Sequence, residues 1–165
     1  MCTYKIKLIN ELQTSSLGEK LSNTCFKKKV LIYLNGEIGT GKTTLIRAFI
    51  KQMGYNKFIK SPTYTIIEKY NIKNIILLHI DLYRINNIHE LEILGLKEYI
   101  EESSICLIEW PKNNIKYIKK PDININLSYI DNHREAKIKY KSIRGKKIIN
   151  KLINNNNFIN IKYIY

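Results

Sequence analysis

The sequence predicts an α/β fold with three layers and a mixed sheet, and three observations lead to this prediction. An apolar run over residues 30–34 leads through a glycine-rich turn into an amphipathic segment, which is the strand–turn–helix order of α/β proteins. Residues 64–70 and 74–80 flank a short turn and predict an antiparallel hairpin. Residues 123–127 and 136–140 alternate apolar with polar side chains, and they predict a second hairpin with one wet face.

The glycine-rich turn, Gly36-Glu37-Ile38-Gly39-Thr40-Gly41-Lys42-Thr43, fits the phosphate-loop pattern G-x-x-x-x-G-K-[ST] in full. In such a loop the backbone amides and the following helix N-terminus direct partial positive charge at an anion. Lys42 is then expected to reach the β- and γ-phosphates of a nucleotide, and the Thr43 hydroxyl to face Mg²⁺. The predicted fold is therefore P-loop NTPase-like. The alternative is a glycine-rich turn with no ligand.

Two further apolar runs end in a carboxylate. Residues 75–80 precede Asp81, and residues 105–108 precede Glu109. A carboxylate at the end of a core strand lies near the phosphate loop in nucleotide-binding folds, so each is a candidate for Mg²⁺ or for the attacking water. A Glu exposed at a strand end is the alternative for Glu109. His79, within the first run, is interpreted as a hydrogen-bonded strand residue rather than a base.

The segment Lys60-Ser61-Pro62-Thr63-Tyr64-Thr65 follows the phosphate-loop helix. Proline excludes a helix here, and hydroxyl side chains lie on both sides of it. Two interpretations stay open: a switch that senses the γ-phosphate, or an ordinary turn into the next strand.

The remaining elements follow from apolar periodicity and capping residues. A single domain is expected over residues 1–153, with a low-complexity, mobile tail over residues 154–165. The other predicted elements are an extended segment over 4–10, a helix over 15–26 capped by Thr14 or Ser15, helices over 45–53, 88–94, 97–102 and 145–153, and a polar link over 112–121.

Composition limits the class of protein without identifying it. The net charge of +14 and the pI near 9.6 suit contact with a polyanion such as RNA, although a chain rich in Ile, Lys, Asn and Tyr also fits A/T-rich codon usage. No apolar run approaches the about 20 residues needed to span a bilayer, and no secretory signal follows Met1. Cys2, Cys25 and Cys106 lack C-x-x-C spacing, which favours reduced thiols in the cytoplasm over a zinc site.

Together these stretches resemble one family, the bacterial TsaE (YjeE) P-loop ATPases of tRNA threonylcarbamoyladenosine synthesis. The resemblance covers roughly residues 6–150, in the order and spacing that the family shows. The motifs that carry it are Leu34-Asn35-Gly36-Glu37 through Thr44, Lys60-Ser61-Pro62-Thr63-Tyr64-Thr65, His79-Ile80-Asp81-Leu82-Tyr83-Arg84, Glu90-Leu91-Glu92, Ile105-Cys106-Leu107-Ile108-Glu109-Trp110-Pro111 and Arg134-Glu135-Ala136.

The resemblance implies a small ATPase that acts with TsaB and TsaD on the adenosine next to the tRNA anticodon, and that does not transfer the threonylcarbamoyl group itself. Its ATP hydrolysis would reset the TsaB–TsaD complex between turnovers. By motif match, Thr43 and Glu109 would hold Mg²⁺, and Asp81 would lie by the γ-phosphate or the attacking water, with Lys42 as its catalytic partner. The ATP-binding residues would be Glu11, Gly36, Gly39, Thr40, Gly41, Lys42, Thr43, Thr44 and Arg134.

Three other functions are weighed against this one. A GTPase would need Asn or Thr where Lys119 begins Lys119-Lys120-Pro121-Asp122, so guanine specificity is not expected. A small P-loop kinase fits Asp81-Leu82-Tyr83-Arg84, but residues 85–104 contain no arginine for a lid. A nucleotide-gated RNA-binding module without turnover is motivated by the charge of +14.

Overall fold

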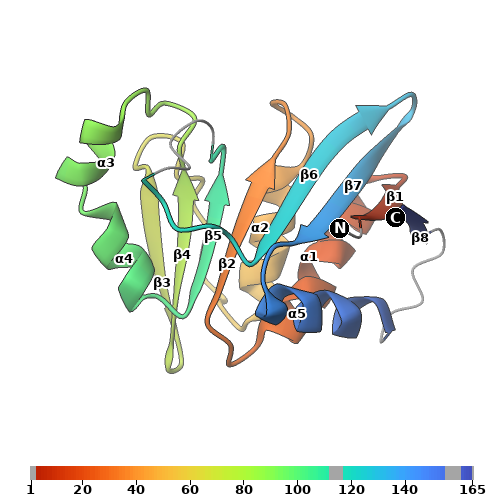
Figure 1. Ribbon diagram of the computed structural model, residues 1–165, viewed down its shortest axis with the longest axis horizontal. Helices are drawn as coiled ribbons and strands as arrows, with labels where there is room; N and C mark the ends of the chain where they lie inside the picture. Colours follow the sequence, from red (N-terminus) through yellow and green to blue (C-terminus); the bar gives the residue numbers. More distant parts are fainter. Residues whose placement is uncertain (1–2, 112–116, 155–160, 165) are drawn as a thin grey trace.

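The computed structural model describes residues 3–111, 117–154 and 161–164, which form an eight-stranded mixed sheet with helices on both faces (Figure 1). The strand order is β3-β4-β5-β2-β6-β7-β1-β8. The elements are β1 (Thr3–Leu8), α1 (Glu11–Cys25), β2 (Val30–Asn35), α2 (Lys42–Gln52), β3 (Ile67–Ile72), β4 (Ile75–Asp81), α3 (Ile88–Ile93), α4 (Leu96–Glu102), β5 (Ile105–Glu109), β6 (Ile123–Ile130), β7 (His133–Tyr140), α5 (Ile143–Asn154) and β8 (Ile161–Ile164).

The centre of the sheet is parallel, and its two sides are antiparallel. Strands β4, β5, β2 and β6 are neighbours in the sheet, and all four run in the same direction. The pairs β3–β4, β6–β7, β7–β1 and β1–β8 are antiparallel. Both predicted hairpins are therefore confirmed, and so is the mixed sheet. The carboxyl ends of β2, β4 and β5 meet at one edge of the sheet, where the sequence places its candidate site.

Two hydrophobic clusters, one on each face of the sheet, produce the three layers. Strand β2 contributes Ile32 and Leu34 to the cluster shared with α1, α2 and α5, and it contributes Leu31 and Tyr33 to the cluster shared with α3 and α4. Successive side chains of a strand point to opposite faces, so a strand that is apolar throughout must be covered on both. Figure 1 shows α3 and α4 beside β3 and β4 at one end of the molecule.

Helix α1 begins earlier than predicted. Its N-cap is Asn10, whose side chain accepts a hydrogen bond from Gln13 N at 3.0 Å, so the prediction of a start at residue 15 with Thr14 or Ser15 as cap is wrong. Asn is among the strongest N-cap residues. The buried Thr14 hydroxyl instead donates to the Asn10 carbonyl at 3.4 Å, within the first turns of the helix.

The first hairpin begins at Ile67 instead of residue 64, because the preceding residues form a tight turn. Ile66 has φ of 65°, and its N–H donates to the Pro62 carbonyl at 2.7 Å. Strand β8 pairs with β1 where the sequence indicates no strand. The predicted mobile tail and the predicted polar link lie partly outside the described residues, at 155–160, 165 and 112–116, and the domain boundary at residue 153 stays a prediction. Within the described ranges, no helix is long and apolar enough to cross a membrane.

Candidate functional site

The phosphate loop connects β2 to α2 at the carboxyl edge of the sheet, and two of its glycines are needed for its shape. Gly36 has φ of 135° and Gly41, the N-cap of α2, has φ of 101°, a region that side chains other than glycine rarely adopt. A Cβ at Gly36 would also overlap the carbonyl oxygen of Leu127 in β6. The loop therefore turns close against the neighbouring strand β6.

Lys42 lies folded over this loop. Its ammonium group donates to the carbonyl oxygens of Gly36 at 2.8 Å and Glu37 at 2.7 Å, and its Nζ lies 4.2 Å from the centre of the Trp110 ring. Burial lowers the pKa of Lys42, whereas the negative charges of Glu109 and Asp81 act in the opposite direction. The phosphate oxygens of a nucleotide would compete with the two carbonyls for the same ammonium protons.

A chain of hydrogen bonds joins the half-buried Thr43 to Glu109 and His79, which are both buried. The Thr43 hydroxyl lies 3.0 and 3.2 Å from the two carboxylate oxygens of Glu109, and His79 Nε2 lies 2.8 Å from Glu109 Oε1. Glu109 is 2% exposed, so the alternative of an exposed strand-end Glu is wrong. His79 is hydrogen-bonded, as the sequence interpretation has it, but its partner is a candidate site residue. With Glu109 ionised, Nε2 is the donor in this pair.

Asp81 lies beside Glu109, because the two residues are register partners on the parallel strands β4 and β5. Its Oδ2 accepts a hydrogen bond from the Thr63 hydroxyl at 3.2 Å, and its Oδ1 accepts one from the Tyr83 N–H at 2.9 Å. The Ser61 and Thr63 hydroxyls lie 3.0 Å apart. The hydroxyl-rich loop is thus hydrogen-bonded directly to one candidate catalytic carboxylate.

The hairpin of β6 and β7 reaches the phosphate loop from the other side. Tyr129 donates to the Gly39 carbonyl at 2.9 Å, and Arg134 Nη2 donates to the Tyr129 hydroxyl at 3.2 Å. A Cβ at Gly41 would lie 3.8 Å from Cδ and Nε of Arg134 and 3.1 Å from Cγ2 of Thr14. Arg134 Nε is buried and has no hydrogen-bond partner among the described residues, so this guanidinium has donor capacity for a ligand.

The structure therefore brings most of the predicted site residues to one edge of the sheet. Glu11 is exposed in the first turn of α1, and Thr14 of the same helix lies against Gly41 of the loop. Thr14 and Tyr129 were not predicted as site residues. A Thr three residues into a helix and a Tyr on the wet side of a hairpin carry no local signal for a site, because their proximity depends on tertiary packing.

Comparison with known proteins agrees with this arrangement. A protein-family model described as threonylcarbamoyl adenosine biosynthesis protein TsaE matches residues 8–138, which include α1, the phosphate loop, both strand-terminal carboxylates and Arg134. The chain belongs to the TsaE family. This confirms the resemblance on which the sequence analysis relied.

Individual TsaE proteins resemble the chain over most of its length. A protein from Haemophilus influenzae named tRNA threonylcarbamoyladenosine biosynthesis protein TsaE is 37% identical over 149 residues, which are 88% of this chain and 94% of the relative. A Bacillus subtilis protein of the same name is 36% identical over 110 residues, covering 67% of this chain and 68% of its own length.

The TsaE fold is also found in a solved structure. The crystal structure of Bacillus subtilis YdiB superposes with a TM-score of 0.76 and 25% sequence identity, and the match covers 95% of this chain and 99% of YdiB. The predicted α/β fold with a mixed sheet is therefore confirmed, and the solved structure shares it.

Proposed function

We propose that this TsaE-family chain binds and hydrolyses ATP within the machinery that forms threonylcarbamoyladenosine in tRNA. The observation that carries the proposal is the contact of the Thr43 hydroxyl with the Glu109 carboxylate at 3.0 Å, directly beside the Lys42 ammonium in a complete phosphate loop. Such a set combines a fixed cation for the phosphates with a hydroxyl and a carboxylate for a metal ion.

The donor set fits Mg²⁺. Within the described residues no group of three or more His, Cys, Asp or Glu side chains gathers as a metal site. Mg²⁺ needs no such cage, because it is commonly held by one or two carboxylates together with substrate phosphates and water. Thr43 and Glu109 would hold the ion, and bound Mg²⁺ would neutralise charge on the β- and γ-phosphates.

The other residues take roles that follow from their positions. Lys42 would compensate the phosphate charge, and Arg134 would reach the nucleotide through its free donor capacity. Asp81, fixed by two hydrogen bonds, would orient the attacking water and accept its proton. Glu11 is proposed as a nucleotide contact from the motif match, made from the exposed first turn of α1.

In this proposal the chain is not the threonylcarbamoyl transferase. It acts in the cytoplasm with TsaB and TsaD, and its hydrolysis resets their complex between turnovers; its contact with tRNA occurs at that complex. The decisive experiment measures phosphate release from ATP with and without TsaB and TsaD. We expect slow hydrolysis by the chain alone and a rate that rises and saturates with the TsaB–TsaD concentration. A rate indifferent to both partners would contradict the proposal.

Thr63→Ala is expected to retain nucleotide binding and to lose the stimulation of ATP hydrolysis by TsaB–TsaD. The Thr63 hydroxyl donates to Asp81 at 3.2 Å, so its loss disconnects the 61–65 loop from the carboxylate that the γ-phosphate would approach. We expect ATP affinity within about twofold of wild type and a loss of at least about tenfold in stimulated rate. Thr65→Ala is the matched control, because the Thr65 hydroxyl donates to Glu68 instead. Full stimulation of both variants would show that the loop is only a turn.

His79→Leu is expected to raise the Mg²⁺ concentration needed for half-maximal hydrolysis, because the buried Glu109 carboxylate loses the donor that fixes it. A hydrogen bond to a charged group is worth about 1.5–3 kcal/mol, enough for an about tenfold shift in Mg²⁺ dependence. His79→Gln retains a donor at similar reach and should restore most of the wild-type Mg²⁺ dependence. Equal Mg²⁺ curves for His79→Leu and wild type would exclude this positioning role.

A further inference from the structure

The amino-terminal edge of the sheet, opposite the phosphate loop, carries a surface rich in positive charge. The segments that enter β2, β4, β5 and β6 meet here, together with the start of α5. Three adjoining pockets on this edge are lined by eight cationic side chains and three carboxylates, Glu101, Glu102 and Asp122. The cations, called the basic face below, are Lys27, Lys28, Lys29, Lys73, Lys97, Lys119, Lys120 and Arg144.

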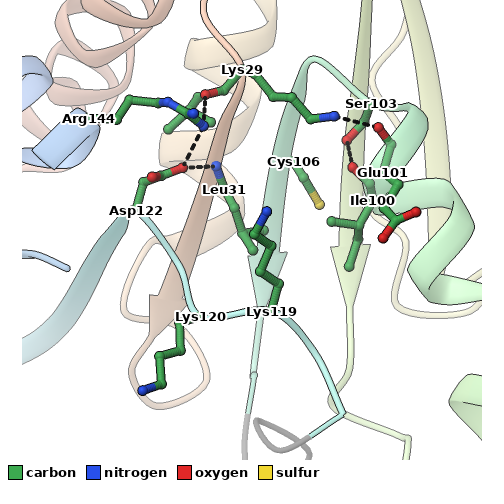
Figure 2. Close-up of a pocket in the computed structure, with 11 residues that line it drawn as sticks. Lys29, Leu31, Ile100, Glu101, Ser103, Cys106, Lys119, Lys120, Asp122 and Arg144 are labelled. Atoms are coloured by element: carbon green, nitrogen blue, oxygen red, sulfur yellow. Dashed lines mark hydrogen bonds and ion pairs between the residues drawn. The ribbon is translucent and has the colours of Figure 1, made fainter. Parts of the chain in front are cut away.

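The cationic side chains of the central pocket bond mainly to backbone carbonyls, so most of the positive charge of the basic face is not neutralised by carboxylates. Lys29 Nζ donates to the backbone carbonyl of Glu101 at 2.6 Å, and Arg144 Nη1 donates to the carbonyl of Lys29 at 2.7 Å. Asp122 is occupied as well: it accepts from Leu31 N–H at 3.0 Å and pairs with Arg144 at 3.6 Å. Figure 2 shows these contacts on one side of the pocket and Lys119 and Lys120 on the segment that borders it.

The three pockets adjoin one another through shared lining residues. The pocket in Figure 2 has a volume of about 170 Å³, and it shares Lys29 and Ser103 with a neighbour of about 700 Å³ that contains the other lysines of the α1–β2 link. Six of the lysines, at positions 27, 29, 73, 97, 119 and 120, are exposed. Exposed ammonium groups along adjoining pockets can follow a chain of phosphates.

We propose that the basic face binds the phosphate backbone of RNA, and that this RNA is the tRNA on which the family's machinery acts. Protein interfaces are depleted in lysine at their cores and enriched in aromatic residues. This edge is instead rich in lysine: seven of its eight cations are lysines. Backbone contacts of this kind position RNA without reading its sequence. They leave the nucleotide site free, because that site lies at the other edge of the sheet.

The test is fluorescence anisotropy of an unmodified tRNA transcript with the full chain over a salt series. One variant carries Lys27→Ala, Lys28→Ala, Lys119→Ala and Lys120→Ala. The matched control carries four lysine-to-alanine changes at exposed positions elsewhere: Lys7, Lys51, Lys57 and Lys139. We expect the first variant to bind at least about tenfold more weakly and to lose about 3 from the log–log salt slope. The control should retain most of both, and circular dichroism verifies folding of each variant.

Equal losses in the two variants would mean that the charge acts diffusely, as codon bias alone would produce, and this would overturn the proposal. Absence of tRNA binding by the wild type would overturn it too. So would a basic-face-dependent preference for anionic phosphatidylserine vesicles or polyglutamate over tRNA. The measurement needs neither ATP nor TsaB and TsaD. Its failure would leave the proposed ATPase standing, and failure of hydrolysis would leave RNA binding standing.

Discussion

Lys42→Ala is expected to abolish measurable ATP turnover and to weaken ATP binding. The ammonium group is a point charge held beside the loop by the Gly36 and Glu37 carbonyls, at 2.8 and 2.7 Å, and it is the cation closest to the expected β- and γ-phosphates. Removing one fixed electrostatic partner of a transition state typically costs about 10²–10³-fold in rate. We therefore expect kcat/KM to fall at least about 100-fold.

Lys51→Ala is the matched control for this variant. Lys51 is an exposed cation in the last turn of the same helix, so its removal changes the net charge equally without touching the loop. Phosphate release and binding of a fluorescent ATP analogue should be near wild type in this control. Wild-type ATP affinity and turnover in Lys42→Ala would show that the phosphate cradle is wrongly assigned.

The parts of the site that could be predicted depend on short stretches of sequence. The loop that ends in Lys42 and Thr43 has a local pattern, and the two carboxylates follow apolar runs that can only be buried strands. Parallel pairing of β4 and β5, in the register that the structure shows, then places Asp81 beside Glu109. Short-range patterns of the same kind predicted both hairpins and the mixed sheet.

The parts that could not be predicted depend on register and packing between distant segments. On β4, His79 lies two residues before Asp81 and on the same face of the sheet. Its register partner on β5 is Leu107, two residues before Glu109, and this places the imidazole within reach of the Glu109 carboxylate. Tyr129 reaches Gly39 only when β6 pairs with β2. The early start of α1 was missed for a different reason: Asn10 and Thr14 are both acceptable caps, and only burial of Thr14 decides between them.

Glu109→Gln is expected to lower hydrolysis in a way that added Mg²⁺ partly restores. Glutamine keeps the shape of the side chain and an oxygen that accepts from His79 or Thr43, so the buried hydrogen bonds at 2.8 and 3.0 Å are largely conserved. What is lost is the negative charge, which is the main attraction of this residue for a hard cation. The measurement is the ATPase rate over a Mg²⁺ titration, where half-saturation should shift upward by about tenfold or more.

Asp81→Asn is expected to behave in the opposite way: ATP binding and Mg²⁺ dependence near wild type, and turnover reduced by about 10²–10⁴-fold at every Mg²⁺ concentration. Asparagine can still accept from Tyr83 N–H and Thr63, so the loop stays in place, but it cannot take a proton from the attacking water. Because both variants exchange one carboxylate for its amide on neighbouring strands, each is the control for the other. If added Mg²⁺ rescued Asp81→Asn and left Glu109→Gln unchanged, the two roles would be exchanged. If it rescued neither, Glu109 would have no part in holding the metal.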